Sequence, residues 1–269
     1  MLFPSESFPS APVTQTALQP PPQTIAELRE TLRAIEGDGH QRRPSLPFGV
    51  GAIDGRLAGE GLRLDALHEV APATARWGDD ASATLFMAGI AARAWGPVLW
   101  AVRRRDLFAP GLYQAGLAPG RLLYVEARDD NELLAIMEEG LRHRGLGAVI
   151  GEVKRAGLAA TRRLQLAAEG GRTIALLLRR YGRGAAEPLG EPSAAVTRWR
   201  VGSAPSAPLP HEGLGRARWH LDLVRQRGGE PFQLTVEASD ETGRIALPAR
   251  MAAGSAPARR ARAAAAAAG

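Results

Sequence analysis

Lysine, the residue that most often contacts the phosphates of a bound nucleotide, occurs only once in this chain, as Lys154. A phosphate-binding P-loop has the pattern G-x-x-x-x-G-K-[ST], in which backbone amides surround the phosphates and the lysine reaches the terminal oxygens. Lys154 instead follows Glu152 and Val153 at the end of a predicted strand, with no such glycine pattern before it. The sequence therefore carries no P-loop of this kind.

The segment in which a strand-to-helix phosphate loop is expected reads APATARWGDDASATL, residues 71–85. Asp79 and Asp80 stand at the predicted start of the following helix, where acidic side chains repel polyphosphate. We expect both aspartates to act as N-caps of that helix. The segment predicts a structural turn and not a phosphate site.

Glu152 closes the apolar run GAVIGE, at the position where many nucleotide hydrolases place the acid that holds magnesium. A carboxylate at the carboxyl edge of a parallel sheet lies where ligands usually bind. Without a phosphate loop this acid has nothing to orient, so we expect a structural or interface role.

Three consecutive arginines, Arg103, Arg104 and Arg105, follow another predicted strand and belong to the same sheet edge. Guanidinium groups at that edge could meet an acidic partner or phosphates. A solvated loop is the commoner explanation of such a run.

Other catalytic and metal-binding patterns are missing from the sequence. It contains no cysteine, which excludes disulfides, thiolate nucleophiles and cysteine-based zinc or iron–sulfur sites. None of the five histidines pairs with another at metal-ligand spacing, and there is no G-x-S-x-G nucleophile elbow. We therefore expect no catalytic residue, no cofactor and no metal.

Arginine and tryptophan alternate in two C-terminal segments, TRWR and RARWH. The candidate DNA-binding residues there are Arg198, Trp199, Arg200, Arg218 and Trp219. Arginine beside aromatic side chains is typical of single-strand binding, in which bases stack and guanidinium groups meet phosphates. The same alternation describes an amphipathic strand with tryptophan in the core and arginine in water, which we favour.

Short apolar runs alternate with amphipathic segments from about residue 46. The expected strands are 66–70, 98–102, 121–126, 148–153 and 173–178, and the expected helices are 81–95, 111–116, 130–144 and 158–169. Runs such as VLWAV, LLYVEA and TIALLL are typical of strands buried on both faces, which indicates a mostly parallel sheet flanked by helices. Strands at 194–201, 218–225 and 232–237 have no helices between them and predict an antiparallel hairpin extension at the sheet edge.

Composition divides the rest of the chain. We expect a proline-rich disordered segment at 1–23, a helix at 24–37, the core at 46–180, C-terminal strands and loops at 181–249, and a disordered Ala/Arg-rich tail at 250–269. The formal charge is +6, but the tail holds four arginines and no acid, so the rest is nearly neutral. The basic character is therefore weak evidence for nucleic-acid binding.

The predicted N-terminal helix has an apolar stripe that must be buried against the chain's own body or a partner. Its members, at helical spacing, are Ile25, Leu28, Leu32 and Ile35. They are our candidate partner-binding residues. The first residues do not have the pattern of a signal peptide, and the most apolar window contains Arg93 and a Gly-Pro pair, so we expect a cytoplasmic protein that does not enter membranes.

The stretch LPFGVGAIDGRLAGEGLRLDALHEV resembles the entrance of the RecA ATPase core, in which a glycine-led turn precedes an Asp-containing helix and the first central strand. The matching residues are Gly49, Ile53, Asp54, Leu57, Gly61, Leu62 and Glu69. Further segments, in order, resemble the ImuA family of bacterial damage-inducible mutagenesis proteins: DLFAPGLYQAGLAPGRLLYVEARDDNELLAIMEEGLR, LGAVIGEV, TRRLQLAAEGGRTIALLLR and SAAVTRWRV. The similarity covers residues 25–240.

This resemblance implies a RecA-like fold that has lost its hydrolytic machinery. Residues 71–84 replace the Walker A segment, and Arg103, Arg104 and Arg105 fall where RecA has its catalytic glutamate. Glu152 alone corresponds to a functional acid, at a degenerate Walker B position. The resemblance also implies an accessory role in SOS-induced error-prone translesion synthesis, with ImuB and a DnaE-type error-prone polymerase. Contacts with RecA, with a second copy or with DNA stay open.

Three other functions remain as alternatives to this non-catalytic adaptor. One is an ATP-dependent RecA-like recombination factor. Another is a SulA-like cell-division inhibitor, although such proteins are shorter and lack the strands after residue 194. The last is a single-strand DNA-binding protein that uses the C-terminal arginines and tryptophans.

Overall fold

The computed structural model describes residues 44–182, 187–209 and 212–248. The predictions for 1–23, 24–37 and 250–269 lie outside these residues. So do the four candidate partner-binding side chains, Ile25, Leu28, Leu32 and Ile35.

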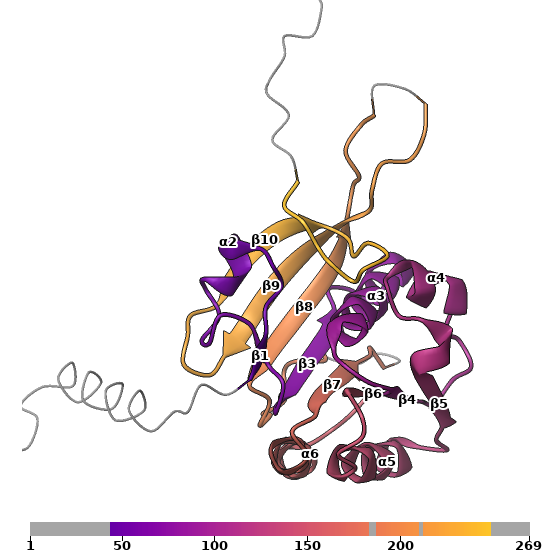
Figure 1. Ribbon diagram of the computed structural model, residues 1–269, viewed down its shortest axis with the longest axis vertical. Helices are drawn as coiled ribbons and strands as arrows, with labels where there is room; N and C mark the ends of the chain where they lie inside the picture. The colour runs from indigo at the N-terminus through magenta and orange to yellow at the C-terminus, as the bar shows by residue number, and fades with distance from the viewer. Residues whose placement is uncertain (1–43, 183–186, 210–211, 249–269) are drawn as a thin grey trace, which may run out of the picture. The chain divides into compact units, whose positions relative to one another are not determined.

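One eight-stranded sheet organises the described chain, in the order β10-β9-β8-β3-β7-β6-β4-β5 (Figure 1). The strands are β3 (Leu67–Pro72), β4 (Val98–Val102), β5 (Leu122–Glu126), β6 (Ala148–Val153), β7 (Ile174–Arg179), β8 (Thr197–Ala204), β9 (Arg218–Gln226) and β10 (Phe232–Glu237). The six strands from β8 to β5 are parallel to their neighbours, whereas β9 and β10 form an antiparallel hairpin beside β8. The predicted mostly parallel α/β, RecA-like architecture with a hairpin extension is confirmed.

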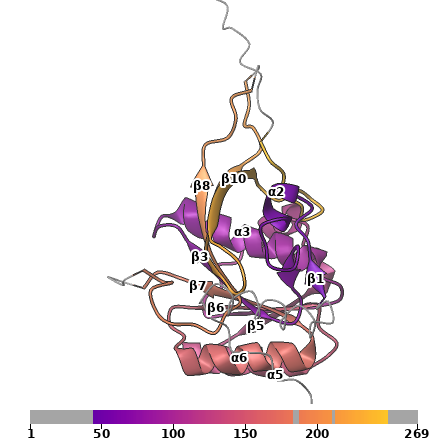
Figure 2. The same ribbon diagram turned by 90° about the vertical axis from the view of Figure 1, so that its left-hand side faces the viewer.

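Helices cover the two faces of this sheet (Figure 2). They are α3 (Trp77–Arg93), α4 (Ala109–Gln114), α5 (Asp130–Arg142) and α6 (Leu158–Gly171), with a 3-10 turn η1 at Pro119–Arg121. Helix α3 packs in one apolar cluster with the hairpin strands, and α5 and α6 pack in a second cluster on the opposite face. Strand side chains therefore alternate between two cores, as the unbroken apolar runs predict.

Two local predictions were wrong. Helix α3 begins at Trp77, four residues earlier than expected, so Asp79 and Asp80 lie in its first turn, and the N-cap is Arg76 with no side-chain cap. Strand β5 was expected to be buried on both faces but forms the sheet edge, with Leu123 and Tyr124 exposed. An apolar run is compatible with either place, because edge position depends on strand order and not on local sequence.

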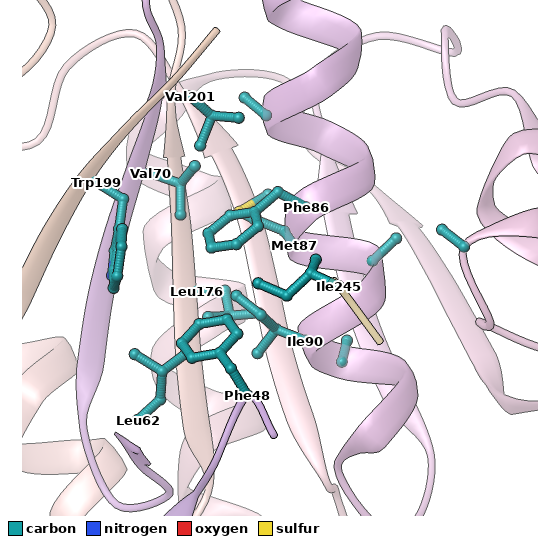
Figure 3. Close-up of a cluster of buried hydrophobic side chains, with 14 of the residues drawn as sticks. Phe48, Leu62, Val70, Phe86, Met87, Ile90, Leu176, Trp199, Val201 and Ile245 are labelled. Atoms are coloured by element: carbon teal, nitrogen blue, oxygen red, sulfur yellow. The ribbon is translucent and has the colours of Figure 1, made fainter. Parts of the chain in front are cut away.

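The core beneath the hairpin is rich in aromatic rings. Phe86 of α3 lies 5.8 Å from Trp199 and 6.1 Å from Trp219, and Phe48 stacks on Phe86 with ring centroids 5.9 Å apart. Figure 3 shows Phe48, Phe86 and Trp199 converging between helix and sheet. Aromatic pairs at these separations add about 1 kcal/mol each beyond burial.

The segment before β3 forms a small cap on this core. It contains α2 (Gly51–Asp54) and a two-stranded sheet of β1 (Ser45–Leu46) and β2 (Leu62–Arg63). The Asp54 carboxylate accepts hydrogen bonds from the backbone N–H groups of Phe48 (2.7 Å), Gly49 (2.8 Å) and Val50 (3.1 Å). Gly49 has a φ of 76°, a region that suits glycine. Asp54 therefore holds the glycine-led turn in place.

Candidate functional site

A pocket of about 370 Å³ opens at the carboxyl edge of the parallel strands. Its walls come from the segment after β3, the first turn of α3 and the loops after β4, β6 and β7. The residues that line it include Thr74, Trp77, Asp80, Arg103, Arg104, Asp106, Glu152, Lys154, Arg180 and Tyr181. Ligands of open α/β sheets bind at this edge, so the pocket is the candidate site.

The floor of the pocket is closed by one guanidinium group. Arg180, directly after β7, donates to the Glu152 carboxylate from Nε at 2.8 Å and from Nη2 at 2.6 Å, and its Nη1 donates to Asp80. Glu152 also accepts a 2.7 Å hydrogen bond from the indole Nε1 of Trp100. Both carboxylates thus have an internal cation as their partner.

Burial and charge act in opposite directions on this group of side chains. Desolvation raises the pKa of Glu152, whereas Arg180 and the Trp100 hydrogen bond lower it, and the net direction is upward. Burial alone would lower the pKa of Arg180, but the carboxylates of Glu152 and Asp80 raise it. Arg180 therefore stays charged, and this geometry is what a structural role for Glu152 requires.

The turn between β3 and α3, residues 73–76, is fixed by hydrogen bonds and carries no glycine. The Asp79 carboxylate accepts from Thr74 Oγ1 at 2.6 Å and from the Ser203 backbone N–H and hydroxyl, each at 2.8 Å. Burial tends to raise the pKa of Asp79, but the bonds from Thr74 and Ser203 hold it below its usual value. Asp79 ties the turn to β8 instead of capping α3.

The predicted arginine run forms the rim of the pocket. Arg103 pairs with Asp130 at 2.9 Å and Arg105 pairs with Glu126 at 2.8 Å. Arg104 and Lys154 are exposed and make no ion pair with any residue of the described ranges. These last two side chains leave the rim with unpaired positive charge.

Trp77 also lies at this rim, with 87% of its surface exposed. Residue type alone did not identify Trp77 as a site residue, because a tryptophan beside an amphipathic helix usually belongs to the core. The available signal for Trp77 was its place just before Asp79 and Asp80, because the N-terminal end of α3 lies at the carboxyl edge of the parallel strands.

The five candidate DNA-binding residues occupy β8 and β9, away from this pocket. Trp199 and Trp219 are 0% and 2% exposed, so neither ring offers a face to a base in this conformation. Arg200 is half-buried between Asp222 (2.7 Å) and Glu187 (3.0 Å), and Arg218 is half-buried. DNA binding through these residues stays a prediction.

The expectation that Arg198 lies in water was wrong. Its Nε donates to Glu69 at 2.6 Å, and Arg179 Nη1 donates to the same carboxylate at 3.1 Å. All three side chains are buried. Period-two alternation placed Arg198 on the correct face, but that face is covered here and supplies a buried carboxylate from the neighbouring strand β3.

Within the described ranges, no three His, Asp or Glu side chains gather in a way that could hold a metal ion. No helix in that part of the chain is long and apolar enough to span a bilayer.

No family model matches the chain. The chain is 41% identical over 206 residues to "Protein ImuA" of Caulobacter vibrioides, from strain NA1000 / CB15N and from strain ATCC 19089 / CIP 103742 / CB 15. The aligned region covers 73% of this chain and 84% of the relative.

Proposed function

The chain belongs to the mutagenesis-associated ImuA family, and we propose that it acts there as a non-catalytic adaptor in SOS-induced, error-prone translesion DNA synthesis. In this role it works in the cytoplasm with ImuB and a DnaE-type error-prone polymerase. It turns over no nucleotide and needs no cofactor.

The observation that carries the proposal is the Asp80–Arg180–Glu152 bridge. A nucleotide site of this architecture needs a phosphate loop on one side and a free carboxylate for the metal on the other. Here the carboxylate of Glu152 is bonded through both Nε and Nη2 of Arg180. The facing turn has no glycine, and Asp79 fixes it to β8. The pocket therefore lies where such sites are found, but Asp80, Glu152 and Arg180 at its floor are bonded to one another.

A non-catalytic adaptor acts by binding its partner proteins. The N-terminal stripe is our candidate for the surface that contacts ImuB, RecA or a second copy of the chain. Its test is a pull-down with the full chain and purified partners. We expect Leu28→Asp combined with Leu32→Asp to reduce capture of ImuB or RecA, or to reduce self-association. Leu158→Asp, an exposed change at the start of α6, is the matched control and should leave capture intact. Unchanged capture of all three would retire the stripe.

The non-catalytic part of the proposal is tested by ATP turnover of the wild-type chain, of Glu152→Gln and of Arg180→Ala. We expect all three to match the buffer blank. Turnover by the wild type that Glu152→Gln abolishes would contradict the adaptor role and favour the recombination factor. Circular dichroism of each variant shows that the comparison is made between folded proteins.

A further inference from the structure

We propose that the rim of the sheet-edge pocket binds single-stranded DNA, with a base stacked on Trp77 and the sugar–phosphate chain lying along Arg76, Arg104, Lys154 and Arg155. This site differs from the β8–β9 residues considered from the sequence. It also stands independently of the adaptor role, since a protein can hold partners with or without it.

The Trp77 side chain is exposed at the rim of the pocket. An indole that is 87% exposed leaves most of its apolar surface in water, and at this place nothing in the described ranges covers it. Trp77 opens a 17-residue helix that is fixed by the Asp79 bonds to Thr74 and Ser203, so the ring is presented from a rigid base. A rigid, exposed aromatic ring is the element on which single-strand binders stack bases.

Four cationic side chains belong to the segments that line or flank this pocket. Arg104 and Lys154 line the pocket together with Trp77. Arg76 directly precedes Trp77 in the chain, and Arg155 directly follows Lys154. All four are exposed, and none makes an ion pair within the described ranges. Their charges are therefore free to meet phosphates.

Most carboxylates in and beside the pocket are neutralised by arginines. Asp80 and Glu152 are both bonded to Arg180, and Asp130 pairs with Arg103. Asp130 also accepts the backbone N–H groups of Lys154 (3.3 Å) and Arg155 (3.1 Å), which orders the cationic loop. Among the described residues, Asp106 is the one lining carboxylate that makes no ion pair, although it contributes to the field that raises the pKa of Arg180.

A single strand fits these features better than the other polyanions. In duplex DNA the bases are stacked and paired, so their faces cannot reach an indole on a protein surface. An acidic peptide would use the cations but leave the ring unused. The Asp80–Arg180–Glu152 bridge also leaves no phosphate-binding loop for a free nucleotide, so we expect the ligand to lie across the rim.

The chain contains a matched control for the stacking step. Trp95 is 93% exposed and follows the other end of α3, so it lies at the opposite edge of the sheet from Trp77. Arg144 and Arg162 are exposed, have no ion pair in the described ranges and lie away from the pocket lining, so they are matched controls for the rim cations.

The experiment is fluorescence anisotropy with a labelled oligo-dT of about 20 nucleotides and the full chain, at about 50 mM salt. We expect Trp77→Ala to weaken binding roughly 5- to 150-fold, the range for loss of one stacked base. Trp95→Ala should bind like the wild type. The oligonucleotide should also quench tryptophan emission in the wild type and in Trp95→Ala, but not in Trp77→Ala.

Salt dependence tests the four cations. For four phosphate contacts to a single strand, a plot of the logarithm of the binding constant against the logarithm of salt concentration should have a slope near −2.8. Affinity should then fall about 50-fold between about 50 and 200 mM salt. The double variant Arg104→Ala, Lys154→Ala should reduce the slope by about 1.4, whereas Arg144→Ala, Arg162→Ala should leave it unchanged.

Several results would overturn the site. They are no detectable binding at low salt, equal effects of the two tryptophan changes, or equal affinity for duplex and single strand with no effect of Trp77→Ala. Because these exposed changes leave the core intact, thermal midpoints of all variants should agree. ImuB capture by Trp77→Ala should stay normal, so failure of the DNA site and failure of the adaptor role give different results.

Discussion

Replacing Glu69 should be among the most destabilising changes in the described chain that remove no apolar packing. The Glu69 side chain is fully buried and holds two buried guanidinium groups, those of Arg179 and Arg198. Arg179 Nε and Arg198 Nη2 already lack acceptors, so loss of the carboxylate adds further unpaired N–H groups to both buried guanidinium groups. Removing one member of a buried ion cluster costs about 3–5 kcal/mol.

Glu69→Ala should fall near the lower end of that range, because Arg179 keeps its bonds to the Ala156 carbonyl (2.8 Å) and to the half-exposed Glu191 (3.3 Å). A loss of about 3 kcal/mol in unfolding free energy lowers Tm by about 6–12 °C for a body of this size. The assay is urea unfolding followed by tryptophan emission, to which the buried Trp100, Trp199 and Trp219 contribute.

Asp222→Ala is the matched control for this experiment. It also removes a carboxylate from an arginine, Arg200, but the pair is partly solvated and Arg200 retains Glu187. Its cost should be below about 1 kcal/mol. If Glu69→Ala costs no more than Asp222→Ala at an unchanged m-value, the buried cluster does not stabilise the fold more than a partly solvated ion pair does.

Three further predictions concern protonation and backbone geometry. Burial lowers the pKa of His68 from 6.5 to about 4, so the folded state binds this proton more weakly than the unfolded chain does. The free energy of unfolding should therefore fall by about 3 kcal/mol as pH drops from 6.5 to 4. Urea titrations across this range should show a smaller fall for His68→Gln. In Arg180→Ala the pKa of Glu152 should rise further, so stability should decrease as pH rises above about 4.5, and adding Glu152→Gln should abolish that dependence; a flat profile in the single variant would contradict it. Arg172 has a φ of 55° at the end of α6, so Arg172→Gly should raise the unfolding free energy by about 1 kcal/mol, and a lower Tm would disprove this.

The sheet was predictable because its signal is local. VLWAV and TIALLL became β4 and β7, buried on both faces, and the helices at 130–144 and 158–169 became α5 and α6 within a few residues. LLYVEA became the edge strand β5, because nothing in six residues states which strand ends the sheet. Local pattern gives an element, and the order of elements comes from the whole chain.

The candidate site was predictable only in part. The missing P-loop, the edge position of Glu152 and the exposed arginine run follow from residue types and strand ends. The partner of Glu152 does not, because Arg180 directly follows the next strand, β7, and is 28 residues away. Arg198 shows the same limit, since Glu69 is 129 residues distant. Pairs of this separation become visible only when the sheet is assembled.

The Arg180 bridge also limits how such a domain can change over generations. Introducing a glycine-rich turn and a lysine after β3 would not by itself create a phosphate-binding site, because Arg180 would still hold Glu152 and Asp80. Losing Arg180 first would leave a buried carboxylate without its counter-ion, at a cost in stability of a few kcal/mol. A phosphate site at this sheet edge would therefore require the turn and Arg180 to change together.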